Sequence, residues 1–452
     1  MPMVHQEREV PASEAEWLLL DRRHVWHPFT QEQTAAKATF IASARAATLI
    51  GHDGSTYLDL ISSWWVITHG HAHPKIAKAI AQQAQRLEHV LFAGFTHAPA
   101  IRLATALAEH LPPGLERVFF SDNGSTAVEV AMKMARQYWF NLGQPRERFL
   151  ACKKGYHGDT VGAMSAGRSS GFFEPFRSML FPVDLLPFPA TWEGDTGVEE
   201  RETAALAALE IYLERHGAEC AALLMEPLVQ GAAGMRMCRP IFVQKLVARL
   251  QAAGILIIFD EVMTGFGRTG TLFACERAGA TPDIICLSKG LTGGFLPMSV
   301  TVCREEIYQA FLGESFDRAF AHGHSFTANP LGCVAALASL ALFAEENTLE
   351  RIAVLEGIHR QRLLALAGHA RVQRPRVTGS IAALDIQAAD AGYASRIGLF
   401  LREFFLERGL LLRPLGNTLY LLPPYCITDS ELHRAWDCVE SALKHLPPAE
   451  IS

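Results

Sequence analysis

The chain has 452 residues, of which 49% are hydrophobic and 19% are charged, as in ordinary globular proteins with more than one domain. A formal net charge of −6 is mild for this length, and no run of like charges stands out, so the sequence indicates neither a nucleic acid nor a membrane surface as partner. A small-molecule substrate is the expectation that follows.

The cysteines and the first twenty residues favour a cytoplasmic protein. Nine cysteines are scattered along the chain without a C-x-x-C pair, which is typical of reduced core thiols rather than of a disulfide framework. The N-terminal stretch lacks the basic start and apolar run of a signal peptide and instead carries Glu7, Glu9, Glu14 and Glu16. Apolar runs such as Val334–Phe343 are well short of the ~20 residues that a membrane helix needs.

Residues 17–59 are mixed and rich in turns, and they close on a short predicted strand at Thr56–Leu60. Between residues 74 and 331, apolar runs alternate with segments of helical periodicity. The predicted strands of this region are Arg117–Ser121, Arg148–Cys152, Ala221–Glu226, Ile255–Asp260 and Asp283–Leu287. The alternation indicates a mainly parallel sheet that helices cover on both faces.

The C-terminal region predicts a second α/β layer, with a helix at Cys333–Glu346 and strands at Gly379–Ile386 and Asn417–Leu422. Pro187–Gly197 predicts an exposed loop. We expect an α/β protein with a large domain and a smaller α/β domain formed by both chain ends. The expected boundaries are residues 1–70 and 332–452 for the small domain and residues 71–331 for the large one.

Two carboxylates, Asp260 and Glu261, end the buried run Ile255–Phe259. The ends of strands are where open α/β sheets build their sites. An acid at this place could cap a helix, bind a metal or serve a cofactor, but Val262–Arg268 supplies no further metal ligand. Functional and structural roles are about equally expected from this run alone.

Lys289 follows a second buried run, Asp283–Leu287. An ordinary lysine at this place would reach into solvent. The alternative is an amine whose pKa is lowered by burial and which attacks aldehydes. Asp260 favours the second interpretation, because pyridoxal phosphate withdraws electrons best when a buried carboxylate keeps its ring nitrogen protonated.

Gly124 and Ser125 stand at the start of a predicted helix, Ala127–Trp139, where free backbone N–H groups can bind a phosphate. A plain helix cap would have the same pattern. Tyr156, in the stretch Gly155–Asp159, offers a ring that could stack on a cofactor, although a single tyrosine is more often simply packed.

Five motifs, in order along the chain, resemble those of the class III aminotransferases of fold-type I. They are the G-S-T helix start at Gly124, G-Y-H-G at Gly155, E-P at Glu226, D-E-x-x-T-G-F-G-R-T-G at Asp260, and S-K-G-L-T-G-G at Ser288. Further stretches resemble the branch of this family that aminates 8-amino-7-oxononanoate in biotin synthesis. They are Trp26–Thr30, Ser62–Trp65, Thr96–Ala100, and Arg413-Pro414 with Tyr420–Tyr425.

The resemblance implies pyridoxal 5′-phosphate as the cofactor. Lys289 would hold it as a Schiff base, Asp260 would face its ring nitrogen, and Tyr156 would lie over its ring. Its phosphate would be bound by Gly124, Ser125 and, from the neighbouring subunit, Ser325. The implied active unit is therefore a homodimer with its active sites at the subunit interface.

For the substrates, the resemblance implies S-adenosylmethionine as amino donor and a ping-pong cycle through pyridoxamine phosphate. Arg413 would bind the acceptor carboxylate, a task that suits its fork of donors, and Trp64 and Tyr420 would line an apolar channel. Phe29 stands where this branch has tyrosine, which removes a hydroxyl and leaves lysine or another amine open as donor. The implied substrate pocket also includes Phe29, Asp159, Arg268 and Gly323.

Three alternatives stay open. Another class III transaminase could act on an ω-amino acid or a diamine with pyruvate or 2-oxoglutarate, although Met263 replaces the glutamine typical of ornithine, acetylornithine and 4-aminobutyrate enzymes. A non-catalytic binding protein could use the same scaffold, which the retained lysine and aspartate oppose. A metal enzyme is the least expected, because no cysteine or carboxylate lies close in sequence to the alternating His69, His71 and His73.

Overall fold

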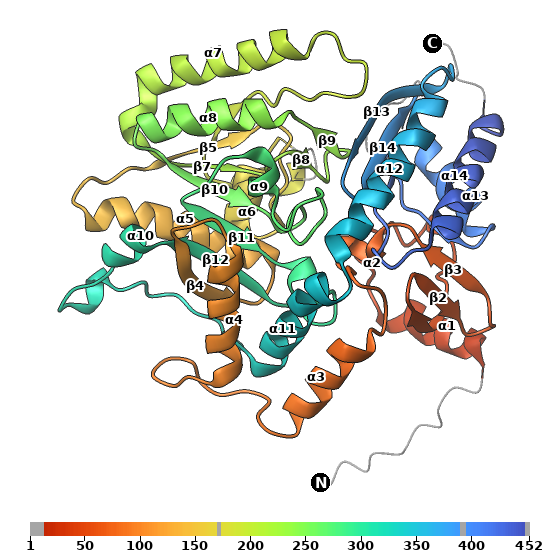
Figure 1. The fold of residues 1–452 in the computed structure, drawn as a ribbon, viewed down its shortest axis with the longest axis horizontal. Coiled ribbons are helices and arrows are strands. Elements are labelled where there is room, and N and C mark those ends of the chain that lie inside the picture. The colour runs from red at the N-terminus through yellow and green to blue at the C-terminus, as the bar shows by residue number, and fades with distance from the viewer. Residues whose placement is uncertain (1–12, 170–172, 389–394, 448–452) are drawn as a thin grey trace.

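The computed structural model describes residues 13–169, 173–388 and 395–447, so the acidic start at Glu7 and Glu9 lies outside the described residues. A seven-stranded sheet forms its centre (Figure 1). The strands are β4 (Leu115–Ser121), β5 (Arg148–Cys152), β6 (Asp184–Leu186), β7 (Cys220–Met225), β10 (Leu256–Asp260), β11 (Ile284–Leu287) and β12 (Ser299–Arg304). In the order β4-β12-β11-β10-β7-β5-β6, β12 is antiparallel to both neighbours, whereas the pairs from β11 to β6 are parallel. The prediction of a mainly parallel sheet is confirmed.

Helices cover both faces of this sheet. Successive residues of a strand point to opposite faces, and in the central strands both sets of side chains are apolar and need to be buried. On one face, Ile258 belongs to the same apolar cluster as α5 (Gly124–Asn141). On the other face, Ile257 packs in the cluster that contains α8 (Pro240–Ala252), and α7 (Val198–His216) packs against α8. Burial on both sides explains why the central strands read as unbroken apolar runs.

The two ends of the chain meet in a smaller α/β layer (Figure 1). One of its sheets contains β1 (Ile41–Arg45), β2 (Thr48–Gly51), β3 (Thr56–Asp59) and β15 (Leu410–Leu411), and the other contains β13 (Val372–Thr378), β14 (Ile381–Ile386) and β16 (Thr418–Leu421). Its helices are α1 (Glu14–His24), α12 (Thr348–Leu366), α13 (Ile397–Leu406) and α14 (Asp429–Lys444). Because β15 pairs with β3, the expected small domain from both chain ends is confirmed, while its boundaries at residues 70 and 332 stay predictions.

The remaining helices and one hairpin complete the described fold. They are α2 (Ser62–Trp65), α3 (Pro74–Ala84), α4 (Ala98–His110), α6 (Val161–Ala166), α9 (Ala274–Ala278), α10 (Glu305–Gln309), α11 (Pro330–Glu345) and the hairpin β8 (Val229–Gln230) and β9 (Arg236–Met237). The helix α11 packs on α3 and α4 and covers most of the predicted Cys333–Glu346. In the described part of the chain, no helix is both long and apolar enough to cross a membrane.

The loop Pro187–Gly197 is irregular, as predicted, but it is not exposed throughout. Its Thr191 N–H donates to the Met237 carbonyl and its Glu193 N–H donates to the Pro375 carbonyl, both at 2.8 Å. Phe188 is only 5% exposed. The expectation of exposure is wrong for this part of the loop, whose backbone bonds to β9 and β13, whereas Gly194 and Thr196 are exposed.

Candidate active site

Asp260 ends β10, and Lys289 follows β11, the next strand of the sheet. Asp260 is in register with Cys286, so the carboxyl ends of these two parallel strands meet at one edge. Both side chains line a cavity of about 470 Å³, called here the cofactor cavity. Its lining also includes Gly124, Ser125 and Tyr156, so the fold brings together residues from four separate motifs.

Lys289 begins a short 3-10 turn, Lys289–Thr292, with a φ of +47°. A left-handed backbone at a residue with a side chain is costly and persists only where the surrounding structure holds it. Burial lowers the pKa of its amine, against the opposing charges of Asp260 and Glu226. Nζ lies 5.2 Å from the ring centre of Trp65. Within the described residues no hydrogen bond or ion pair occupies this nitrogen, so it can act as a nucleophile.

Asp260 is held in place by a buried histidine that the sequence interpretation did not assign. Its Oδ2 lies 2.7 Å from Nδ1 of His157, and its Oδ1 accepts the backbone N–H of Val262 at 3.1 Å. Burial alone lowers the pKa of His157, but its hydrogen bond to Asp260 and the charge of that carboxylate raise the pKa above its usual value. The hydrogen bond fixes the position of the Asp260 carboxylate in the wall of the cofactor cavity, where it can interact with a cation on a ligand.

Glu226, which lies behind the lining of the cofactor cavity, binds the backbone of the segment that carries Tyr156. Its carboxylate accepts the backbone N–H of Tyr156 at 3.1 Å and that of Gly231 at 2.9 Å. Burial raises the pKa of Glu226 to about 7. The hydroxyl of Tyr156 donates to Asp159 at 3.1 Å. Glu226 thus fixes the backbone that carries the tyrosine, a role that the E-P motif alone did not reveal.

The start of α5 combines both interpretations of its sequence, helix cap and anion site. Asn123 is the cap, and its Oδ1 accepts the Thr126 N–H at 3.1 Å and the Ser125 hydroxyl at 2.8 Å. A Cβ on Gly124 would lie 2.6 Å from the Val262 side chain, so only glycine fits there. The helix N-terminus opens into the cofactor cavity beside Gly124 and Ser125, where N–H groups can bind a phosphate.

A second cavity of about 240 Å³, called here the channel, adjoins the first and shares Lys289, Tyr156 and Asp159 with it. The rings of Phe29 and Trp64 lie 5.7 Å apart in its wall. The remaining predicted substrate residues in its lining are Arg413 and Tyr420.

Arg413 and Tyr420 are placed differently in the channel. The guanidinium of Arg413 lies over the Trp64 ring at 4.6 Å, and no hydrogen bond or ion pair to another described residue engages it. Tyr420 is 2% exposed, and its hydroxyl accepts the Trp65 indole N–H at 2.9 Å. Arg413 therefore offers free donors to a ligand, while Tyr420 forms part of a fixed wall.

Three predicted residues lie outside both cavities. Arg268 is 1% exposed, and its guanidinium donates to the carbonyl oxygens of Pro423, Trp65 and Ile67. These donors hold the backbone of two chain segments together, and the predicted substrate contact of Arg268 stays a prediction. Gly323 and Ser325 are exposed and absent from the described lining of either cavity, so their predicted roles across a subunit interface stay predictions.

Glu261, the second carboxylate of its motif, has a structural role. It accepts the backbone N–H groups of Ala274 at 2.6 Å and Cys275 at 2.7 Å, and so caps α9. The three alternating histidines point to different partners, with His71 on Asp59, His73 on Glu346 and His69 packed against Phe343. No group of three or more potential metal ligands occurs among the residues that the structure describes.

Comparison with known proteins links this geometry to one family. Residues 30–443 match the family described as aminotransferase class-III. The adenosylmethionine-8-amino-7-oxononanoate aminotransferase of Synechococcus elongatus is 56% identical over 94% of this chain and 99% of its own. A crystal structure of the enzyme with the same name from Methanocaldococcus jannaschii has 34% identity and a TM-score of 0.89, covering 96% of this chain and 100% of its own. An amine transaminase from an uncultivated Pseudomonas species, in a PLP-bound form, has 31% identity and a TM-score of 0.87, covering 94% and 99%.

Proposed function

This chain belongs to the class III aminotransferases, which use pyridoxal phosphate, and we propose that it transfers an amino group to 8-amino-7-oxononanoate to give 7,8-diaminononanoate in biotin synthesis. S-adenosylmethionine is the proposed donor, in a ping-pong cycle through pyridoxamine phosphate. The observation that carries the proposal is Arg413, a guanidinium stacked on Trp64 with no partner among the described residues, in the channel that leads to Lys289.

The residues of the cofactor cavity fit pyridoxal phosphate. The cofactor supplies an aldehyde that binds amines covalently and a ring that draws electrons from the substrate carbon. We assign Gly124 and Ser125 to its phosphate, because a helix N-terminus opens there. Asp260, held by His157, would serve the ring nitrogen, where its charge would favour the protonated form. Tyr156 would contact the ring.

Lys289 has two tasks in this proposal. Its unpartnered amine, with a pKa lowered by burial, would hold the cofactor covalently and would be released when a donor amine takes its place. Once free, the same Nζ would take a proton from the substrate carbon that bears the nitrogen and would deliver it to the cofactor carbon on the other side of that nitrogen, as general base and then general acid. The strained backbone at Lys289 keeps Nζ in position for both transfers.

The channel residues select the acceptor. Arg413 binds the carboxylate at one end of 8-amino-7-oxononanoate through paired N–H donors. Phe29, Trp64 and Tyr420 surround its hydrocarbon chain, and Asp159 lies at the end nearer Lys289. The half-exposed rings of Phe29 and Trp64 can adjust to a donor of different shape, which a ping-pong enzyme requires.

The proposal includes a cytoplasmic homodimer. Gly323 and Ser325 are exposed in one subunit and would complete the phosphate and substrate sites of its partner. All nine cysteines of the chain are free thiols in the structure, which supports a reducing compartment.

The decisive experiment incubates purified holoenzyme with 8-amino-7-oxononanoate and a panel of donors, with 7,8-diaminononanoate measured by mass spectrometry. We expect product with S-adenosylmethionine. Product with lysine alone would keep the acceptor and change the donor, as the missing hydroxyl at Phe29 allows. Absence of product with every donor, together with amination of an unrelated ketone, would contradict the proposed acceptor.

A further inference from the structure

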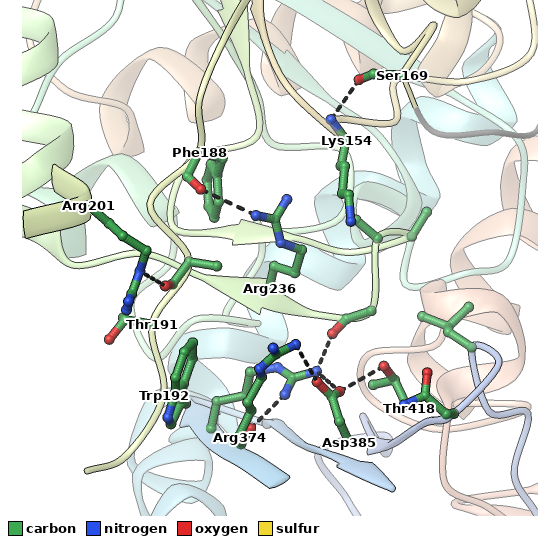
Figure 2. Close-up of a pocket in the computed structure, with 17 residues that line it drawn as sticks. Lys154, Ser169, Phe188, Thr191, Trp192, Arg201, Arg236, Arg374, Asp385 and Thr418 are labelled. Atoms are coloured by element: carbon green, nitrogen blue, oxygen red, sulfur yellow. Dashed lines mark hydrogen bonds and ion pairs between the residues drawn. The ribbon is translucent and has the colours of Figure 1, made fainter. Parts of the chain in front are cut away.

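A third cavity, of about 670 Å³, lies outside the active site (Figure 2). It is bounded by the docked loop Pro187–Gly197, by the turn between β8 and β9, and by residues of β13 and β14. We call it the cationic cavity, after the basic side chains in its lining: Lys154, Arg201, Arg236, Arg374 and Arg376. It shares only Ala232 and Leu415 with the described lining of the channel.

The charges in the cationic cavity do not balance. The carboxylate of Asp385 lies 2.7 Å from the Arg376 guanidinium and 3.6 Å from that of Arg374. Arg201 forms an ion pair with Asp195 at the edge of the cavity. Two carboxylates thus face five cations, which leaves an excess of three positive charges in a concave site.

The basic residues fall into two groups by their hydrogen bonds. Arg376 is 5% exposed, and its guanidinium is already hydrogen-bonded within the protein, because it donates to Asp385 and to the Met235 and Gly234 carbonyls. By contrast, Lys154 uses only its backbone N–H, which donates to Ser169, and its ammonium group has no partner among the described residues.

Arg374 and Arg236 also face the cavity with donors to spare. The side chain of Arg374 is 59% exposed, and its only ion pair within the described residues is the long one to Asp385. Arg236 donates to Gln230 at 2.8 Å, to the Phe188 carbonyl at 3.2 Å and to the Lys153 carbonyl at 3.5 Å, which leaves its Nε–H and one N–H of Nη2 without a partner among the described residues. Together with Lys154, these side chains line one cavity (Figure 2), and they come from the turn after β5, from β9 and from β13.

The aromatic side chain Trp192 fixes the rim of the cavity. The guanidinium of Arg201 lies 4.9 Å from its ring centre and that of Arg374 lies 5.3 Å from it. Burial lowers the pKa of Arg236, and the positive charges of Arg376 and Arg374 lower it further, although Cys152 acts in the opposite direction. Like charges are therefore held close together, and a bound anion would relieve their repulsion.

We propose that the cationic cavity is a binding site for a small phosphorylated molecule, in which a diphosphate or a phosphate monoester contacts Lys154, Arg236 and Arg374. The excess positive charge matches an anion that carries two or three negative charges. Donors from three elements suit the several oxygens of a phosphate group better than the two of a carboxylate. The site is separate from the cofactor phosphate cradle at Gly124 and Ser125, so both can be occupied in the holoenzyme.

Calorimetric titration of the holoenzyme, saturated with pyridoxal phosphate, with inorganic pyrophosphate tests the proposal. We expect saturable binding, and a dissociation constant at least about tenfold higher for the double variant Lys154→Ser with Arg374→Ser, which removes two charge-assisted contacts. Succinate at matched ionic strength should bind more weakly than pyrophosphate. Equal binding of the two anions would overturn the assignment to phosphate.

Two control variants locate the site. Arg215→Ser removes an exposed cation at the far end of α7, fourteen residues beyond Arg201 or about 21 Å along the helix, and should leave the dissociation constant unchanged. Arg413→Leu should also leave it unchanged, because Arg413 lines the channel. Loss of binding in either control, or no saturable heat in the wild type, would contradict the proposal.

Discussion

The cofactor cavity and the channel meet at Lys289, yet they are built from different parts of the chain. The cofactor cavity uses the ends of central strands and one helix N-terminus, and its key carboxylates accept short hydrogen bonds from His157 or from backbone N–H groups. The channel uses Phe29, Trp64 and Arg413, which belong to segments from the two chain ends.

This difference separates the residues that carry out proton transfer from the residues that select the substrate. The buried groups of the cofactor cavity are positioned by hydrogen bonds such as that between Asp260 and His157, which hold their atoms in place for proton transfer. In the channel, Phe29 is 50% exposed and Trp64 is 43% exposed, and Arg413 has free donors. Changes in the cofactor cavity should therefore act on turnover, and changes in the channel should act on the affinity for one substrate.

The largest expected effect comes from Lys289→Ala. Loss of the amine removes both the covalent hold on the cofactor and the proton-transfer group, so turnover should fall by about 10⁴-fold, the upper range for general acid–base catalysis. Turnover is measured with saturating substrates, and borohydride reduction followed by mass spectrometry detects the covalently held cofactor. Lys245→Ala, at an exposed position of α8, is the matched control. A Lys289→Ala variant with bound, reducible cofactor would refute the assignment.

Asp260→Asn should have the next largest effect. The amide keeps the shape of the carboxylate but removes its charge, and without that charge the pKa of His157 falls because burial then dominates. We expect turnover to fall by about 10²–10³-fold, as for other single preorganised electrostatic groups. The acceptor KM should change little. Steady-state kinetics measure kcat and KM separately. A rise in the acceptor KM without a fall in kcat would mean that Asp260 contributes to substrate binding and not to turnover.

The sequence predicted the cofactor cavity better than the channel, for a physical reason. Asp260, Lys289 and Gly124 stand at the ends of apolar runs or at a helix start, and such signals are local along the chain. The strand β12 was missed although it separates β4 from β11. Its partner β11 directly precedes it in the chain, but its other partner, β4, is distant in sequence, so its place between the two follows only from the folded sheet.

Residues that act through tertiary contacts could not be assigned in advance. His157 and Glu226 sit in recognisable motifs, but their roles depend on Asp260 and Tyr156 reaching them in the folded chain. Arg268 is a second example. It stands in a motif of the site, but in the folded chain its guanidinium donates to backbone carbonyl oxygens. For Phe29 and Arg413, the family resemblance, rather than any local pattern, supplied the prediction.

Arg413→Leu tests the channel with an intermediate effect. Removing a charged hydrogen-bond partner costs about 1.5–3 kcal/mol, so the KM for 8-amino-7-oxononanoate should rise by about 10- to 100-fold while kcat changes less. The methyl ester of the same acceptor lacks the carboxylate and is the internal control. Its KM should hardly differ between wild type and variant. An equal rise for acid and ester would mean that Arg413 shapes the channel without binding the carboxylate.

Glu261→Gln should give the smallest effect, on stability rather than on chemistry, although Glu261 is the immediate neighbour of Asp260. Burial raises the pKa of Glu261 from its usual 4.5 to about 7, so the folded protein binds a proton that the unfolded chain releases between these pH values. This contribution to stability is complete below pH 4.5 and is lost as the pH rises through 7. The free energy of unfolding is measured by urea titration at pH 5 and at pH 8. Its fall from pH 5 to pH 8 should be larger in the wild type than in Glu261→Gln, by about 1–3 kcal/mol. The same loss in both proteins would show that Glu261 is not protonated at pH 5, and a large fall in kcat at pH 8 would make it part of the chemistry instead of a cap on α9.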